Sequence, residues 1–506
     1  MKVNVTVKGY TQVSPAEIAI AYRQSPEWQL YEVVMTSALM GNLYECAPER
    51  AVAIRTLVSL CDPVFVAKLA VYVRQNLNLR TVPLILTVEL ARIHQGDTLV
   101  QRAVNQVVVR ADEITELLTC YQYANQRMGS KKLNRLSKQI QIGLQNAFNR
   151  FDEFQFSRCN NAAEIKLRDA LFLVHPKAKD ASQQQILNKI VTDELATPDY
   201  WESELTSLTQ ANYSSEIERT EAFRNTWQGL IDNRKVGYIA LLRNLRNLLK
   251  SSVSEIHVEK VCEFLTAPEA IVRHKQTPFR YLAAWREVSR FTTPEAAMLK
   301  VALEKAVLIA AANISGFDES SRVLVACDIS GSMQKPVTPK SAVNLFDIGL
   351  LTGMMLRPVC KNVITGVFGS EWKTVNFPTT NALLHLDSYY RHEGEVGYAT
   401  NSHLAIRHLT DREISVDKIM IFSDGHLWDQ AGQRSDLAMT WMKYKQLYPK
   451  SKLYLFDLAA HGRVTVEPYH REDVTVISGW ADRIFDVLAA IDNGGDALLD
   501  IKSLRI

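Results

Sequence analysis

The chain has 506 residues, of which 47% are apolar and 22% charged, and its formal net charge is +3. This length predicts about two to four domains, and the composition is typical of a globular protein rather than a collagen-like or low-complexity chain. The chain contains no uninterrupted apolar run of about 18 residues, so no transmembrane helix is expected. The N-terminus also lacks the apolar core of a signal peptide. Seven scattered Cys without a CxxC pair indicate a reducing compartment. We therefore expect a cytoplasmic protein with no membrane partner.

The net charge conceals an uneven distribution along the chain. Residues 1–316 hold 38 Lys and Arg against 32 Asp and Glu, whereas residues 317–506 hold 20 against 23. The first part therefore carries +6 and the second −3, which indicates different partners for the two parts.

Helical patterns dominate the first part, from about Pro15 to Ala312. Apolar residues recur there at three- and four-residue spacing, with short breaks at Pro, Asn, Gly or Asp. Examples are residues 66–74, 83–93, 237–249 and 294–311. Many helices of about 10–18 residues without strands predict paired helices stacked as a solenoid.

The pattern changes near residues 314–316, after which strands alternate with helices. Strands are predicted at 322–327, 362–368, 418–422, 453–458 and 474–477, and helices at 341–355, 399–409, 435–448 and 482–491. This βαβα order predicts a parallel sheet with helices on both faces, so any ligand is expected at the carboxyl ends of the strands. The predicted division is 1–316 and 317–506.

Hard oxygen ligands follow two of these predicted strands. Asp328, Ser330 and Ser332 form a DxSxS motif after the first, and Asp424 ends the strand 418–422. Thr400, in the loop before a predicted helix, adds a further hydroxyl. Carboxylates and hydroxyls at a strand end suit one octahedral Mg²⁺ ion. The alternative is an ordinary turn whose Ser caps a helix.

Three segments of the first part contain basic residues and no acid. They are residues 117–151 with Arg127, Lys131, Lys132, Arg135, Lys138 and Arg150; residues 233–254 with Arg234, Lys235, Arg243, Arg246 and Lys250; and residues 270–286 with Arg273, Lys275, Arg280 and Arg286. On a helix, Arg243, Arg246 and Lys250 share one face, opposite a row of leucines. Such segments are a typical phosphate-binding pattern, although each alone could be an ordinary solvated helix face.

The metal-binding motif resembles that of the von Willebrand factor A domain, whose metal-ion-dependent adhesion site uses DxSxS, a loop Thr and a later Asp. Asp328, Ser330, Ser332, Thr400 and Asp424 match this pattern. The sequence Gly397-Tyr398-Ala399-Thr400 departs from it by lacking Gly-Gly before the Thr. In that family an acidic group from a partner often completes the coordination.

Several strings in this order resemble the TROVE module proteins, the Ro autoantigen and its bacterial orthologues. They are LRDALFLVHPK at 167–177, ALLRNLRN at 240–247, TPFR at 277–280 and ISGWAD at 477–482. The resemblance spans roughly residues 60–490, and the first 60 residues match poorly. It implies an all-α HEAT-like helical-repeat solenoid closed into a ring by an α/β, Rossmann-like A domain.

The resemblance also implies a function. Such proteins bind small structured Y RNAs on an outer basic surface and single-stranded 3′ ends of misfolded or immature RNAs in the central hole, in RNA quality control and decay. It implies RNA contacts around Arg158, Lys166, Arg168, His175 and Lys177. The usual aromatic residue after Arg158 is replaced by Cys159, whereas Asp169 is expected to cap or pair locally. The alternative for His175 is a His-Pro turn that only ends a helix.

Two other functions compete with RNA binding. A protein–protein scaffold would use the metal to recruit a partner such as an exoribonuclease. A metallohydrolase using Asp328 and Asp424 lacks a general-base motif, a paired metal cluster and a nucleophile elbow. We therefore expect a monomeric RNA-binding protein that is not an enzyme.

Overall fold

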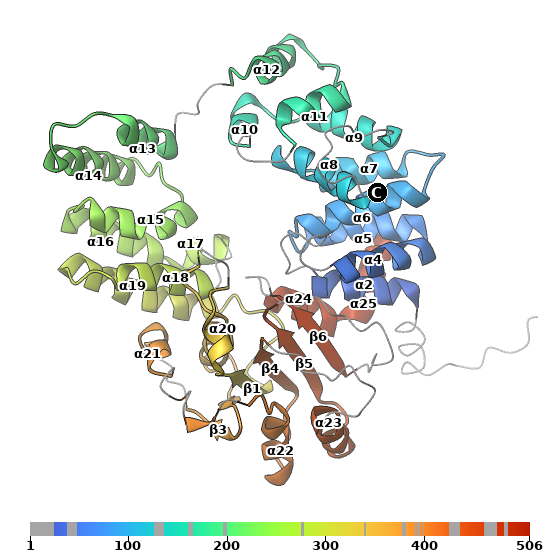
Figure 1. Ribbon diagram of the computed structural model, residues 1–506, viewed down its shortest axis with the longest axis vertical. Coiled ribbons are helices and arrows are strands. Elements are labelled where there is room, and N and C mark those ends of the chain that lie inside the picture. Colours follow the sequence, from blue (N-terminus) through green and yellow to red (C-terminus); the bar gives the residue numbers. More distant parts are fainter. Residues whose placement is uncertain are drawn as a thin grey trace, which may run out of the picture.

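Most of the chain can be described in the computed structural model: residues 25–37, 48–125, 136–159, 165–195, 200–274, 278–337, 341–376, 381–389, 392, 395–397, 399–424, 436–459, 473–479 and 484–506. Figure 1 shows the helices as two arms that rise from a sheet at the base and approach each other at the top. No strand precedes Arg322 within these described residues, as the helical periodicity predicts.

The first arm contains ten described helices. They are α2 (Pro26–Ser37), α4 (Pro48–Leu60), α5 (Pro63–Gln75), α6 (Thr81–Ile93), α7 (Leu99–Val107), α8 (Asp112–Ala124), α9 (Lys138–Phe148), α10 (Glu153–Ser157), α11 (Leu167–Val174) and α12 (Ala181–Thr192). Helix α5 packs on both α6 and α7, α6 on α8, and α7 on α9. Contacts between next-but-one helices are those of a two-layered helical stack.

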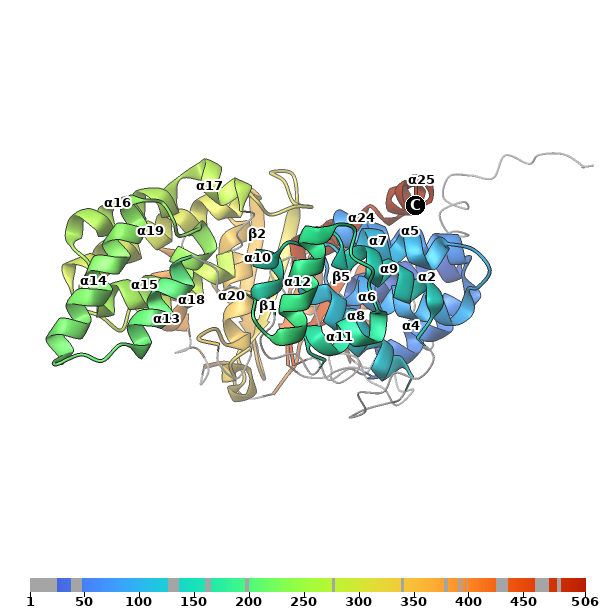
Figure 2. The same ribbon diagram turned by 90° about the horizontal axis from the view of Figure 1, so that it is seen from above.

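The second arm repeats this arrangement. It consists of α13 (Trp201–Gln210), α14 (Glu216–Asp232), α15 (Tyr238–Lys250), α16 (Glu255–Thr266), α17 (Pro268–Arg273), α18 (Pro278–Val288) and α19 (Pro294–Ala311). Helix α15 packs on α18, and α16 on α19. In the view from above, the two arms extend to either side of the sheet (Figure 2).

The α/β unit at the base holds one six-stranded sheet in the order β3-β2-β1-β4-β5-β6. Its strands are β1 (Arg322–Asp328), β2 (Asn362–Phe368), β3 (Trp372–Thr374), β4 (Lys418–Ser423), β5 (Lys452–Asp457) and β6 (Val474–Ser478). The five predicted strands pair in parallel, as expected, and the structure adds the short β3, which pairs antiparallel with β2. Only residues 369–371 join these strands, and a parallel crossover needs a dozen or more residues.

Helices cover both faces of this sheet, as predicted. On one face, every residue of α20 (Leu345–Leu356) is buried. A Cβ at Gly349 would lie 2.7 Å from the Cys327 sulfur, so this glycine allows α20 to approach β1 closely. On the other face, α22 (His403–Asp411) and α23 (Asp436–Leu447) share a hydrophobic cluster with alternate residues of β1 and β4.

Two predicted helices begin later than expected. The helix predicted from Ser341 starts at Leu345, because the Asp347 carboxylate accepts a hydrogen bond from the Asn344 N–H (2.7 Å) and so fixes the N-cap there. The helix predicted from Ala399 starts at His403. The structure adds η1 (Gly331–Gln334) and α21 (Ala382–Tyr389), which periodicity did not predict.

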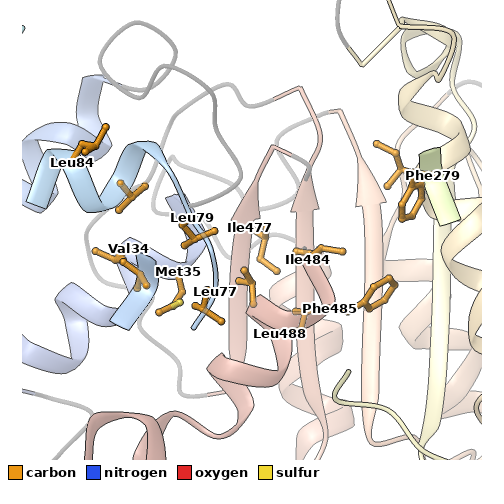
Figure 3. Packing of buried hydrophobic residues seen from close by; sticks show 14 of the residues in the cluster. Val34, Met35, Leu77, Leu79, Leu84, Phe279, Ile477, Ile484, Phe485 and Leu488 are labelled. Atoms are coloured by element: carbon orange, nitrogen blue, oxygen red, sulfur yellow. The ribbon is translucent and has the colours of Figure 1, made fainter. Parts of the chain in front are cut away.

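Both ends of the helical array contact the α/β unit. At the first arm, Val34 and Met35 of α2 lie close to Ile477 of β6 and Leu488 of α24 (Ile484–Asp492), in one hydrophobic cluster (Figure 3). Helix α25 (Gly494–Ser503) packs on α5.

At the second arm, α18 and α19 contact α20. Arg286 of α18 forms a two-point ion pair with Asp347 of α20. None of the described helices is long and apolar enough to cross a membrane.

Candidate functional site

The loop after α11 is held by a row of amide side chains on α9. Gln145 donates hydrogen bonds to the carbonyls of Val174 (2.9 Å) and His175 (3.2 Å). Asn149 donates to the Lys177 carbonyl (2.8 Å) and accepts from the Lys179 N–H (2.9 Å). These bonds fix the backbone, while the side chains of His175, Lys177 and Lys179 remain exposed.

His175 itself ends helix α11. It adopts a left-handed conformation (φ 50°, ψ 58°), and its N–H donates to the Leu171 carbonyl. This conformation is uncommon for a residue other than glycine, and the bonds from α9 maintain it. The helix-ending interpretation is therefore confirmed, and it is compatible with an exposed imidazole.

Helix α11 presents two exposed cations next to this loop, Lys166 at its start and Arg168 within it. The Asp169 carboxylate accepts a hydrogen bond from the Lys166 N–H (3.2 Å), which confirms its predicted capping role. The Arg168 guanidinium lies over the ring of Phe172 at 5.8 Å. Leu167, Ala170 and Val174 are buried, so the opposite face of the helix anchors it.

Arg158, at the end of α10, lies close to two aromatic rings. Its guanidinium is 5.8 Å from the ring centre of Phe154 and 5.4 Å from that of Tyr200. Cys159 indeed supplies no ring, but the fold brings two rings from elsewhere. Tyr200 immediately precedes α13, so this cluster joins the first arm to the second.

Helix α15, in the opposite arm (Figure 1), has the predicted amphipathic form. Arg243, Arg246 and Lys250 are exposed, whereas Leu241, Leu242, Leu245 and Leu248 are buried. Arg246 pairs with Glu287 of α18 at 3.2 Å. Because both partners are partly exposed, this contact is weak and phosphate can compete for Arg246.

The structure also places other basic residues of these segments. Arg273 is exposed at the end of α17, and Arg280 is half-buried in α18. Arg127, Lys131, Lys132, Arg135 and Lys275 lie outside the described residues.

Some basic residues of the three segments instead have structural partners, and Lys235 pairs with Glu204 at 3.3 Å. Arg150 donates to the carbonyls of Asn105 and Val108, and Arg286 pairs with the buried Asp347. Segments without acidic residues could not reveal these contacts, because the partners are distant in the chain.

The DxSxS segment and Asp424 meet at the carboxyl ends of β1 and β4. Asp328 is buried, and its carboxylate accepts from the Ser330 N–H (2.9 Å). The hydroxyls of Ser330 and Ser332 are 3.1 Å apart, and Ser332 donates to Asp424 (2.9 Å). This is also where the strand order reverses, the usual ligand position in such sheets.

Ser423 belongs to the same network but was not predicted. Its hydroxyl donates to the second oxygen of Asp328 at 2.6 Å, and the residue is fully buried. Its position before Asp424, at the end of an apolar strand, was the available signal. Burial raises the pKa of Asp328, and the hydrogen bonds from Ser423 and Ser330 oppose this rise.

Thr400 is placed near this edge but not within the network. The N–H of Asn401 donates to the Gly369 carbonyl just beyond β2, so the loop lies at the same end of the sheet. A Cβ at Gly369 would be 2.4 Å from the Gly397 carbonyl oxygen, which shows how closely the two segments approach. Thr400 is exposed, and no hydrogen bond among the described residues joins it to Asp328 or Asp424.

The chemistry of this cluster is that of a hard oxygen site. In the described part of the chain, no three His, Cys, Asp or Glu side chains converge as metal ligands. The cluster instead offers two carboxylates and serine hydroxyls, and exposed Ser332 opens it to solvent. This donor set fits one Mg²⁺ ion that retains water.

Comparisons with known proteins place this geometry in context. The family model of the TROVE domain matches residues 40–212 and 194–305. The crystal structure of the Deinococcus radiodurans Ro (Rsr) protein aligns over 87% of this chain and 93% of that chain, with a TM-score of 0.63 and 18% identity. This likeness concerns the fold.

The matches to sequence relatives cover a much smaller part of this chain than the structural match does. Telomerase protein component 1 of Rattus norvegicus and of Mus musculus are each 35% identical over 96 residues, 19% of this chain. The match spans about 3% of the length of these curated relatives.

Proposed function

This chain belongs to the TROVE domain family, and on that basis we propose that it is a noncoding-RNA-binding protein. The observation that carries the proposal is the exposed basic segment at 166–179. Lys166, Arg168, His175, Lys177 and Lys179 all reach solvent there, and the one carboxylate among them, Asp169, caps the helix. Exposed cations on a fixed backbone suit phosphate contacts.

We further propose that the arms and the α/β unit form a ring whose hole receives single-stranded 3′ ends of misfolded or immature RNAs. Small structured, Y-like RNAs bind its outer basic surface, and the protein acts in RNA quality control and decay. Contacts of both array ends with the α/β unit, and the Arg158–Tyr200 contact between the arms, support the ring. The exposed face of α15 supplies phosphate contacts.

Charge reversal on α15 tests this proposal. The Arg243→Glu/Arg246→Glu variant should bind a structured RNA with a single-stranded 3′ tail at least tenfold more weakly at matched salt, because each lost phosphate contact also lowers the counterion release. Lys443→Glu, at an exposed residue of α23, is the control and should bind as the unmodified chain does. Equal binding by all three proteins would refute the α15 assignment.

A second function rests on the Asp328 cluster. We propose that the α/β unit is a von Willebrand factor A domain whose Asp328, Ser330, Ser332 and Asp424, with Thr400, hold Mg²⁺. The cation would supply an open coordination position for an acidic residue of a protein partner, such as an exoribonuclease. Asp328→Ala should abolish capture of that partner and leave RNA affinity unchanged.

A further inference from the structure

Two phenylalanines near the basic segment are unusually exposed. Phe154 is 46% exposed and Phe172 48%. Among the large hydrophobic side chains that are exposed in the described residues, the only other phenylalanine is Phe264, at 38%. Exposed aromatic rings beside cations are candidates for stacking contact with a nucleobase.

An arginine lies over each of these two rings. Arg158 is 5.8 Å from the Phe154 ring centre, and Arg168 is 5.8 Å from that of Phe172. Tyr200 completes the first group, with its ring centre 5.5 Å from that of Phe154 at an interplanar angle of 71°. Each group thus presents planar surfaces beside a fixed positive charge.

Another arginine–phenylalanine pair in the chain serves as a comparison, because its surroundings do not suit base stacking. Arg219 lies 5.9 Å from the ring centre of Phe223 on α14. That ring is half-buried, and Arg219 pairs with Glu216 (3.5 Å) close to Glu218 and Glu221. Glu202 also interacts electrostatically with Arg158, so the greater exposure of the Phe154 and Phe172 rings, not an absence of acids, distinguishes these two positions from Phe223.

We infer that Phe154–Arg158–Tyr200 and Arg168–Phe172 are two nucleobase-stacking positions, and that they select unpaired nucleotides. Aromatic rings and guanidinium planes both stack on bases, and the adjacent cations hold the phosphates. Bases in a duplex are already stacked and cannot use these surfaces. This inference rests on the proposed RNA binding.

The position of the first group adds a consequence. Phe154 and Arg158 belong to the first arm, whereas Tyr200 begins the second. A base stacked there contacts both arms at the point where they approach each other. An unpaired nucleotide therefore joins the two arms as well as binding to one surface.

The test separates stacking from charge attraction. The full chain is titrated with a ten-nucleotide oligoadenylate and with an abasic oligonucleotide that carries the same phosphates. Phe154→Leu and Phe172→Leu keep apolar volume but remove the ring. Each should weaken oligoadenylate binding by about tenfold and leave abasic binding and the salt dependence unchanged.

Two controls complete the experiment. Phe223→Leu and Phe264→Leu should bind both oligonucleotides as the unmodified chain does. Photo-cross-linking with 5-iodouridine RNA should modify peptides containing Phe154, Phe172 or Tyr200.

Three results would overturn the inference. They are equal affinity of the unmodified chain for both oligonucleotides, equal losses on both in Phe154→Leu, and an equal loss in Phe223→Leu. If the unmodified chain binds neither oligonucleotide, RNA binding itself fails. If a protein partner displaces oligoadenylate from the unmodified chain but not from the Phe154→Leu or Phe172→Leu variant, the rings form a protein-docking site instead.

Discussion

Two aspartates of this protein have different roles because one is partly exposed and the other is buried. Asp169 is partly exposed and caps the start of α11. Asp328 is fully buried, and its oxygens receive hydrogen bonds from Ser330 and Ser423. Because a buried carboxylate is costly without a compensating charge, the cation that we propose at this site would stabilise Asp328 more than it would an exposed acid.

Removal of this carboxylate gives the first prediction. Mg²⁺ should raise the melting temperature of the unmodified chain, because a ligand that binds only the folded state stabilises it, by about 2.7 kcal/mol at 100 times Kd. Asp328→Asn should lose this shift, and chelation with EDTA should reverse it. An equal Mg²⁺ shift in the variant would place the cation elsewhere.

The proposed partner capture depends on the same residue. With Mg²⁺ present, Asp328→Asn should fail to retain the acidic partner, and RNA affinity should stay within twofold of the unmodified chain. Parallel RNA titrations and pull-downs measure both. A joint loss would mean that the variant damages the fold or that the two sites are linked.

The element that presents the basic loop is α9. Gln141 and Gln145 of this helix and its C-cap residue Asn149 are spaced four residues apart, and each forms a hydrogen bond with the backbone of residues 174–179. We therefore propose that these amides affect RNA binding by holding the loop rather than by touching RNA. Without them, His175 is free to leave its left-handed conformation.

Substitution of Asn149 gives an element-scale prediction. Asn149→Ala removes both bonds to the loop, so the free energy of unfolding should fall by about 1–2 kcal/mol. RNA affinity should fall several-fold, since the cations lose their fixed spacing. Gln184→Ala, on exposed α12, is the control. If Asn149→Ala is destabilised but binds RNA with unchanged affinity, the fixed loop does not contribute to RNA recognition.

The sequence was most informative at this scale. Periodicity predicts α15 and its buried leucines, and the strand at 362–368 agrees residue for residue. The contact of Arg158 with Tyr200 was not predictable, because Tyr200 reaches it only where the two arms meet. Likewise, β3 was missed because three residues are too short to show period-2 alternation.

At the scale of the whole molecule, two different interfaces hold the helical array to the α/β unit. The first arm joins through a hydrophobic cluster around α2 and α24, and Tyr31 donates to the Ala490 carbonyl (2.8 Å). The second arm joins through Arg286 and Asp347, with Asp347 fully buried. On sequence alone, Arg286 counts among the phosphate-binding residues. The sequence could not reveal its pairing with Asp347, because the two residues are 61 positions apart.

Loss of one partner of this ion pair should be strongly destabilising. Arg286→Ala leaves Asp347 buried and unpaired, which should cost about 3–5 kcal/mol in the free energy of unfolding. Arg286→Met/Asp347→Asn should recover most of this loss, because it removes the uncompensated charge and keeps the cap of α20. Arg290→Ala, which removes an exposed pair with Glu287, should cost less than about 1 kcal/mol. Chemical denaturation measures all three, and equal losses would contradict the interface.

The proposal that the helical arms bind RNA is tested most directly by ultraviolet cross-linking of the full chain in its native host, with both the peptides and the RNAs identified. We expect cross-linked peptides from residues 153–179 and 238–250, joined to small noncoding RNAs or to RNAs with unpaired 3′ ends. Cross-links confined to residues 317–506, or a purified chain that carries no RNA, would contradict it.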